Sequence, residues 1–150
     1  MNIDVAVCLP QESETVGLIR TVVTNTLLLF GVADDCVEDI RLALSEACTN
    51  VIEHAANDDD YEVRVQVDDW QCTLTVKNAG DDFDAAALSG QMPDTSSARG
   101  RGVAIMYAVV DQVAFQSVPE SGMIVHLVKN LTVKDGSPLA RIRQRTPRPG

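Results

Sequence analysis

The stretch ADDCVEDIRLALSEACTNVIEHAAN, Ala33 to Asn57, decides the fold class, because it is the clearest amphipathic helix in the sequence. At 100° per residue, Glu46, Asn50 and His54 lie one turn apart along the border of its apolar stripe. Such a border lies at the edge of a core, where a ligand site can form, or it simply faces solvent. The stripe itself consists of Val37, Ile40, Leu44, Ala47, Cys48, Val51 and Ala55.

The segments around this helix predict an α+β protein. Strands joined as hairpins, with helices between them, favour a two-layer sandwich in which helices cover one face of a mostly antiparallel mixed sheet. In chain order we expect a strand over 2–9, helices over 12–31 and 33–57, a hairpin over 61–78 turning at Asp68-Asp69, a polar segment over 81–99, a helix over 100–110 and a hairpin over 111–131 that turns near 119–122.

Length and charge indicate one domain over residues 1–131, followed by a different tail. The net charge is −10, yet residues 132–150 hold five of the twelve bases and only one acid, so the first 131 residues carry −14. Such a body repels nucleic acid and membrane surfaces and attracts a basic protein partner. Because the tail is basic and proline-containing, we expect it to be disordered. The start of the chain has no basic region before an apolar run, and no stretch could span a bilayer, which favours a cytoplasmic protein.

The four cysteines predict no disulfide and no zinc site. Cys8, Cys36, Cys48 and Cys72 contain no CxxC pair, and each lies among apolar neighbours. Buried free thiols are therefore expected. His54 and His126 show no metal-ligand spacing, and both are expected to be structural.

Two further motifs carry possible chemistry. VKNAGDDFD, Val76 to Asp84, ends a predicted strand in a turn with three carboxylates, which fits a plain turn, a metal loop or one wall of a ligand site. GRG, Gly100 to Gly102, opens a helix whose first N–H groups are free to bind an anion, and glycine lets a phosphate approach them closely. Arg99 and Arg101 beside it favour an anion, although glycine often merely begins a helix.

Taken together, the motifs resemble a known family. LALSEACTNVIEHA, GDDFD and GRGVAIMYAVVDQV, in this order, resemble the anti-sigma-factor serine/threonine kinases within the GHKL (histidine-kinase-like) ATPase superfamily. The resemblance spans residues from about 3 to 131 and implies ATP and Mg²⁺ as ligands. It also implies a sigma factor and an anti-sigma antagonist as partners, with partner switching in the control of transcription, and a homodimer. Dimer and sigma contacts would use the first strand and first helix, where Arg20 is a candidate contact.

The resemblance also assigns roles to residues. Glu46 would be the general base toward a serine or threonine hydroxyl, and Asn50 would bind Mg²⁺ held by the nucleotide phosphates. Asn78 and Gly80 would line the adenine side of the site. The phosphates would contact Gly100, Arg101 and Gly102, and the segment 81–99 would form a lid whose Thr95, Ser96 and Ser97 reach phosphate oxygens.

Three positions depart from the family pattern, which has Asp-x-Gly-x-Gly after the strand and Gly-Thr in the last hairpin. Asn78 replaces the aspartate, Asp82 replaces the second glycine, and Met123 replaces the threonine. The loss of a charge-assisted bond at Asn78 would weaken binding by about 1 kcal/mol. These departures leave open a non-catalytic partner-switching module with weak or lost nucleotide binding, and a preference for guanine if the Asn78 NH₂ faces the base. A metal-binding domain using Asp81, Asp82 and Asp84 is a third interpretation.

Overall fold

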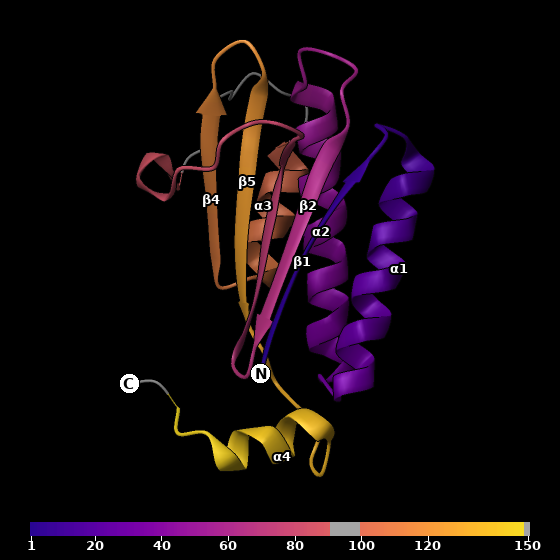
Figure 1. Cartoon of the computed structure of the whole chain (residues 1–150), viewed down its shortest axis with the longest axis vertical. Coiled ribbons are helices and arrows are strands. Elements are labelled where there is room, and N and C mark those ends of the chain that lie inside the picture. The colour runs from indigo at the N-terminus through magenta and orange to yellow at the C-terminus, as the bar shows by residue number, and fades with distance from the viewer. Residues whose placement is uncertain (91–99, 149–150) are drawn as a thin grey trace.

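The computed structural model describes residues 1–90 and 100–148. One face of a five-stranded sheet is covered by helices α1, α2 and α3, which confirms the predicted two-layer α+β fold (Figure 1). The sheet has the order β1-β2-β3-β5-β4, and all four neighbouring pairs are antiparallel. The elements are β1 (Asn2–Leu9), α1 (Ser13–Phe30), α2 (Asp34–His54), β2 (Tyr61–Asp68), β3 (Gln71–Asn78), the 3₁₀ helix η1 (Ala85–Ala87), α3 (Gly100–Val109), β4 (Gln112–Val118), β5 (Gly122–Asn130) and α4 (Pro138–Arg145).

Helix α2 lies at the centre of the core. It contacts β5, β3 and β2 on one side and both α1 and α3 on its flanks. The strands present alternate residues to it, since Val76 pairs with Val125 and Leu74 pairs with Leu127 in the β3–β5 register. The fully buried side chains of this core include Ile40, Leu44, Val51, Tyr61, Val63, Met106, Phe115 and Leu127. A long helix held on three sides gives a rigid platform for the residues along its border.

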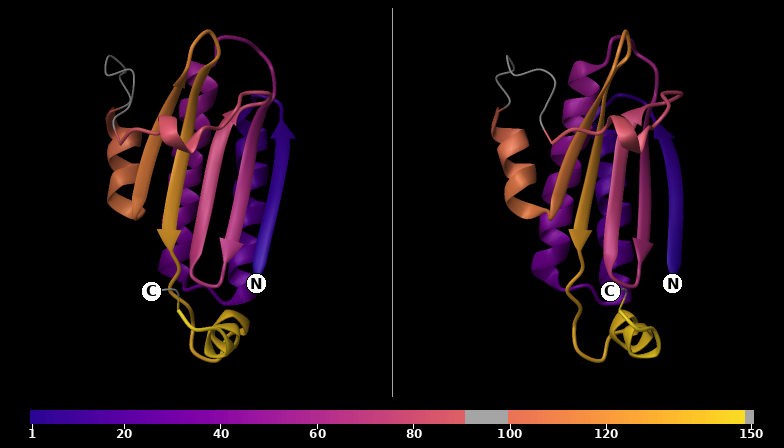
Figure 2. Two further views of the ribbon diagram at one scale, coloured as in Figure 1. Left: turned by 60° about the vertical axis from the view of Figure 1, so that its left-hand side comes forward. Right: turned by 90° about the vertical axis from the view of Figure 1, so that its left-hand side faces the viewer.

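After β3 the chain crosses the outer face of the sheet, away from the helices (Figure 2). Ser89 then pairs with Phe115 at the open edge of β4, with both backbone hydrogen bonds at 2.7 Å. Phe83 in this crossing segment stacks on His126 of β5, with ring centroids 5.2 Å apart. Burial lowers the pKa of His126, whose Nδ1 lies 3.0 Å from the Thr75 hydroxyl. His126 is thus structural, as expected.

The tail is folded over residues 132–148, so the expectation of disorder was wrong there. Ser137 caps α4 by accepting from the Ala140 N–H at 3.2 Å, and Pro138 occupies the first helical position. Leu139 is fully buried. Arg143 donates to the carbonyl oxygens of Asp69 and Leu131 at 2.6 and 2.7 Å and lies over the Trp70 ring. The boundary drawn after residue 131 remains a prediction.

The docking of α4 gives a stability prediction. Leu139→Ala should lower the free energy of unfolding by about 2–4 kcal/mol, because it opens a cavity under α4. Leu29→Ala is the matched control, since Leu29 is 77% exposed on α1 and its truncation should cost less than about 0.5 kcal/mol. Chemical denaturation of the two variants and the parent measures both values. Equal stabilities of the two variants would contradict a docked α4.

The cysteines are free, as expected, but only three of them are buried. Cys36, Cys48 and Cys72 lie in the core, whereas Cys8 is exposed on the edge strand β1. Burial raises the pKa of Cys48 and of Cys72 to about 12, so neither is a thiolate near neutral pH. Within the described ranges, no helix has the length and apolar composition needed to cross a membrane.

Candidate functional site

The border of α2 carries the first part of the site. Asn50 has no solvent exposure, yet neither its Oδ1 nor its Nδ2 has a hydrogen-bond partner among the residues that the structure describes. A buried amide without partners costs about 1–3 kcal/mol. One turn further on, the His54 Nδ1 lies 2.9 Å from the Asn50 backbone oxygen, so that side chain is tied to the helix. An amide that lacks partners among the described residues is a candidate ligand contact.

Gly102 in the first turn of α3 faces the same border. A Cβ atom added at Gly102 would lie 2.5 Å from the Glu46 Oε2 and 4.0 Å from the Asn50 Oδ1. A larger residue at this position would therefore push the end of the Glu46 side chain aside, or move the start of α3. Because the first N–H groups of a helix lack internal partners, this contact brings anion-binding groups beside Glu46 and Asn50.

The close approach at Gly102 gives a second prediction. Gly102→Ala should displace the Glu46 carboxylate or the start of α3, and should therefore weaken the binding of the Mg²⁺-ATP that the family resemblance implies by at least about tenfold. Gly17→Ala is the matched control, because the Gly17 site is also helical and its nearest atom lies 3.9 Å away. A calorimetric titration of both variants checks the difference. Unchanged affinity in Gly102→Ala would contradict the placement of the ligand at α3.

The other end of the site lies where β3 and β5 meet the C-terminal end of α2. Asn78, the last residue of β3, is 1% exposed. A Cβ atom at Gly122 would lie 3.0 Å from the His54 backbone oxygen and 3.2 Å from the Asn78 Nδ2, and Gly122 has a φ of +150°. Gly122 therefore lets the β4–β5 turn approach both groups. Asn78 thus lies beside the last turn of α2, one turn beyond Asn50.

The carboxylates after β3 do not form a metal site. Asp81 accepts from the Ser121 hydroxyl, with both carboxylate oxygens at 2.8 Å, and Asp84 caps η1 by accepting from the Ala86 N–H. Asp82 is exposed, and its backbone oxygen accepts from Gln116. Within the described part of the chain, no three His, Cys, Asp or Glu side chains gather as a metal would need. The metal-loop interpretation is therefore wrong for these residues.

The remaining predicted residues divide between described and undescribed parts. Gly80 forms the turn after β3 with a φ of +89°, and Arg101 is exposed in the first turn of α3. Gly100 is the first residue of α3. Arg20 on α1 donates to the Ser45 hydroxyl at 3.3 Å, next to Glu46 in sequence. Thr95, Ser96, Ser97 and Arg99 lie outside the described residues.

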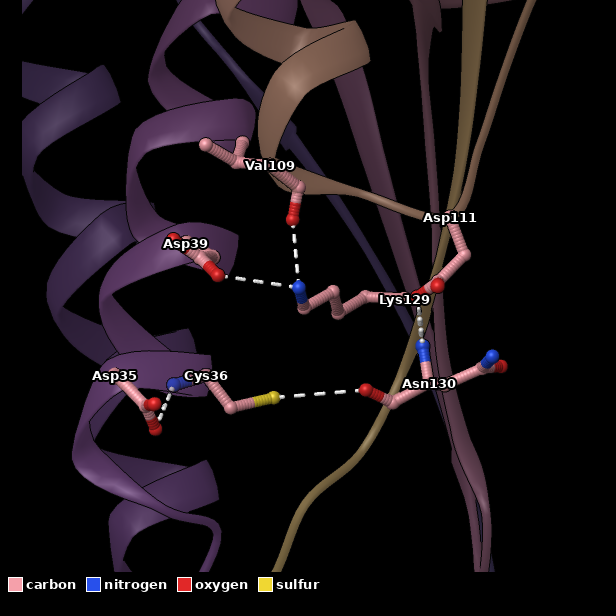
Figure 3. Close-up of polar contacts among 7 residues, drawn as sticks. All are labelled: Asp35, Cys36, Asp39, Val109, Asp111, Lys129 and Asn130. Atoms are coloured by element: carbon pink, nitrogen blue, oxygen red, sulfur yellow. Dashed lines mark hydrogen bonds and ion pairs between the residues drawn. The ribbon is translucent and has the colours of Figure 1, made fainter.

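A second polar cluster lies toward the N-terminal end of α2 (Figure 3). Lys129 of β5 forms an ion pair with Asp39 at 3.1 Å and donates to the Val109 carbonyl oxygen at 2.7 Å. Asp111 accepts from the Asn130 N–H at 2.7 Å. The carboxylates of Asp35, Asp39 and Asp111 each already accept a hydrogen bond within the protein. The cluster therefore holds α2, α3 and β5 together, and it is not part of the candidate site.

Sequence reasoning missed Ser121 and the positional role of Gly122. Ser121 lies 43 residues from Asn78 in sequence, yet its backbone oxygen accepts from the Asn78 Nδ2 at 2.8 Å. The sequence predicted only a turn near residues 119–122. A predicted turn does not indicate which distant residue, here Asn78, its backbone will contact. Met123 is buried in the core and offers no hydroxyl to the site.

Helix α2 packs on an antiparallel sheet, and its Glu46 and Asn50 face the glycine-led start of α3. This arrangement is that of a histidine kinase-like ATPase domain. The model of that family matches residues 9–129, and the chain belongs to it.

Several relatives are named "Serine-protein kinase RsbW". The protein of that name from Bacillus velezensis is 34% identical, over 82% of each chain. The one from Bacillus licheniformis is 32% identical over 85% of this chain and 88% of its own length. The one from Bacillus subtilis is 32% identical over 81% of this chain and 82% of its own.

Proposed function

We propose that this protein is a Mg²⁺-ATP-dependent serine/threonine protein kinase of the anti-sigma type, acting in the cytoplasm. One observation carries the proposal: a fully buried Asn50 amide, without partners among the described residues, lies against the start of α3 beside the Glu46 carboxylate. A carboxylate can take the proton of the attacking hydroxyl, an amide oxygen can bind Mg²⁺ and a helix N-terminus can bind phosphate, which are functions that phosphoryl transfer from a nucleotide uses.

The residues present fit Mg²⁺ and ATP. Asn50 would supply an amide oxygen to Mg²⁺, a cation that needs few protein ligands when phosphates supply the others. When bound there, Mg²⁺ would neutralise phosphate charge. The first N–H groups of α3, with Arg101 near them, would bind phosphate oxygens. The glycines at positions 100 and 102 leave room for that contact.

Glu46 would carry the chemistry. Its carboxylate accepts the proton of a serine or threonine hydroxyl on a protein substrate. The hydroxyl oxygen then bonds to the γ-phosphorus of ATP as the bond from that phosphorus to the β-γ bridging oxygen breaks. The products are a phosphorylated protein and ADP, with the proton held on Glu46 until solvent takes it.

The alternative of a non-catalytic module finds less support. Of the three departures from the family pattern, Asp82 is exposed and bonded through its backbone, and Met123 is part of the core. Asn78 still presents a buried oxygen, because its Oδ1 has no partner among the described residues. The adenine side therefore keeps one acceptor, and the placement of Glu46 and Asn50 beside the start of α3 supports a catalytic role.

The partners are a sigma factor and an anti-sigma antagonist, and the surface between β1 and α1 is the candidate for contact and for a homodimer. An apolar groove of about 110 Å³ opens there, lined on one side by Ile3 and Val5 and on the other by Ile19 and Val22. Val5 and Val22 are about half exposed. Exposed apolar area of this kind is typical of an interface, and Arg20 lies on the same helix.

The proposal is tested by incubating the protein with Mg²⁺, ATP labelled at the γ-phosphate and a candidate antagonist protein. Label on a serine or threonine of the antagonist is the expected result. No transfer, with Glu46→Ala indistinguishable from the parent, would overturn the kinase. Calorimetry then separates the alternative, because a non-catalytic module would also fail to bind Mg²⁺-ATP up to millimolar concentration.

A further inference from the structure

The Asn78 amide is held in one orientation. Its Nδ2 donates to the Ser121 backbone oxygen at 2.8 Å and approaches the Ser121 Oγ at 3.3 Å. The same backbone oxygen also accepts from the Ala56 N–H at 2.9 Å. A carbonyl oxygen can only accept, so a flipped amide would place two acceptors 2.8 Å apart. The Asn78 Oδ1 must therefore point away from Ser121.

The Ser121 hydroxyl is fixed as well. Its single proton goes to Asp81, whose two carboxylate oxygens both lie 2.8 Å away, so only lone pairs face Asn78. Asp81 is held in turn by its backbone. Its N–H donates to the Asn78 backbone oxygen at 3.2 Å, and its backbone oxygen accepts from the Lys77 Nζ at 2.7 Å. A chain of directed bonds thus runs from Asp81 through Ser121 to Asn78.

The result is a buried acceptor without a donor. The Asn78 Oδ1 has no partner in the described part of the chain. A ligand that buries this end of the site must supply an N–H group, since an oxygen there would face another oxygen at close range. The 6-amino group of adenine is such a donor. Guanine and hypoxanthine carry a carbonyl oxygen at that position.

We propose that Ser121, itself oriented by Asp81, is a positioning residue that fixes the Asn78 amide and thereby selects an amino-bearing purine over a 6-oxopurine. This inference rests on the proposed nucleotide site. It replaces the idea that Asn78 turns its NH₂ toward guanine, since that NH₂ is already engaged. It also explains how Asn78 can accept a hydrogen bond from adenine at the position where the family pattern has aspartate.

The chain of hydrogen bonds from Asp81 through Ser121 to Asn78, called the relay below, predicts that Asn78→Asp weakens nucleotide binding. A carboxylate at position 78 would place an oxygen against the Ser121 carbonyl and a second negative charge close to Asp81. Although aspartate is the stronger acceptor in principle, the variant should bind ATP about tenfold more weakly than the parent. Adding Asp81→Asn frees the Ser121 proton to bond to the new carboxylate, so the double variant should regain about threefold or more.

Calorimetric titration with ATP, GTP and ITP in Mg²⁺ tests the proposal, with thermal unfolding as the check on folding. Asn57→Asp is the control, because it makes the same change at an exposed residue of the α2–β2 loop and should leave the affinity unchanged. The parent should prefer ATP over both 6-oxopurine nucleotides by more than about tenfold.

The outcomes separate this inference from the proposed function. A parent that binds no nucleotide would overturn both. A parent that binds ATP, with Asn78→Asp binding as tightly or more tightly, would overturn only the orientation of Asn78. A double variant no tighter than Asn78→Asp would overturn the relay through Ser121, and equal affinities for ATP and GTP would overturn the selectivity.

Discussion

Glu46→Gln is expected to lower the rate of phosphoryl transfer by about 10²–10⁴-fold while Mg²⁺-ATP still binds. Glutamine keeps the shape of glutamate but cannot accept the substrate proton. The end of the Glu46 side chain lies against Gly102, and glutamine occupies nearly the same volume there. Single-turnover transfer of labelled phosphate to the antagonist measures the rate, and calorimetry measures the binding.

Glu38→Gln provides the control for this prediction. Glu38 lies on the same helix, is exposed and pairs at the surface with Arg41. Its pKa is lowered by that hydrogen bond, but the pair faces solvent and lies away from the site. The rate should stay within about twofold of the parent. A Glu46→Gln rate equal to that of the parent would rule out Glu46 as the general base.

Asn50→Leu is expected to stabilise the protein and to abolish the binding of Mg²⁺-ATP. The buried amide has no partners among the described residues, so removing it relieves an uncompensated desolvation cost. The free energy of unfolding should rise by about 1–2 kcal/mol. A leucine offers no oxygen to Mg²⁺, so calorimetry should detect no binding.

Asn25→Leu is the control that separates the effect of removing a buried amide from the effect of a higher helix propensity. Asn25 is exposed on α1, so the change there gives the same gain in propensity, a few tenths of a kcal/mol, without removing a buried amide. Its nucleotide affinity should match that of the parent. If Asn50→Leu were destabilised or still bound Mg²⁺-ATP normally, Asn50 would be an ordinary core residue and no ligand site would be centred on it.

The sequence predicted the elements well, because their signals are local. The strand at 2–9 and the helix at 34–54 follow from apolar periodicity, and Glu46 and Asn50 follow from their spacing along α2. The β2–β3 turn lies at Asp69-Trp70, one residue later than expected, since the Asp68 carboxylate accepts from the N–H groups of Trp70 and Gln71 and belongs to the strand end.

Two features could not be predicted from the sequence, for different physical reasons. The tail was expected to be disordered because proline and arginine dominate its composition, yet Ser137 and Pro138 are a helix start and Leu139 fills a core position. The orientation of the Asn78 amide depends on Ser121, which is distant in sequence. Composition and spacing contain no information about such a contact.

The central claim is that one site, running along α2 from Glu46 to the end of β3, binds Mg²⁺-ATP. Isothermal titration of the parent protein with ATP in the presence of Mg²⁺ tests it most directly. One site per chain with a micromolar dissociation constant is the predicted result. No heat of binding up to millimolar ATP, from protein that is folded by its thermal transition, would contradict it.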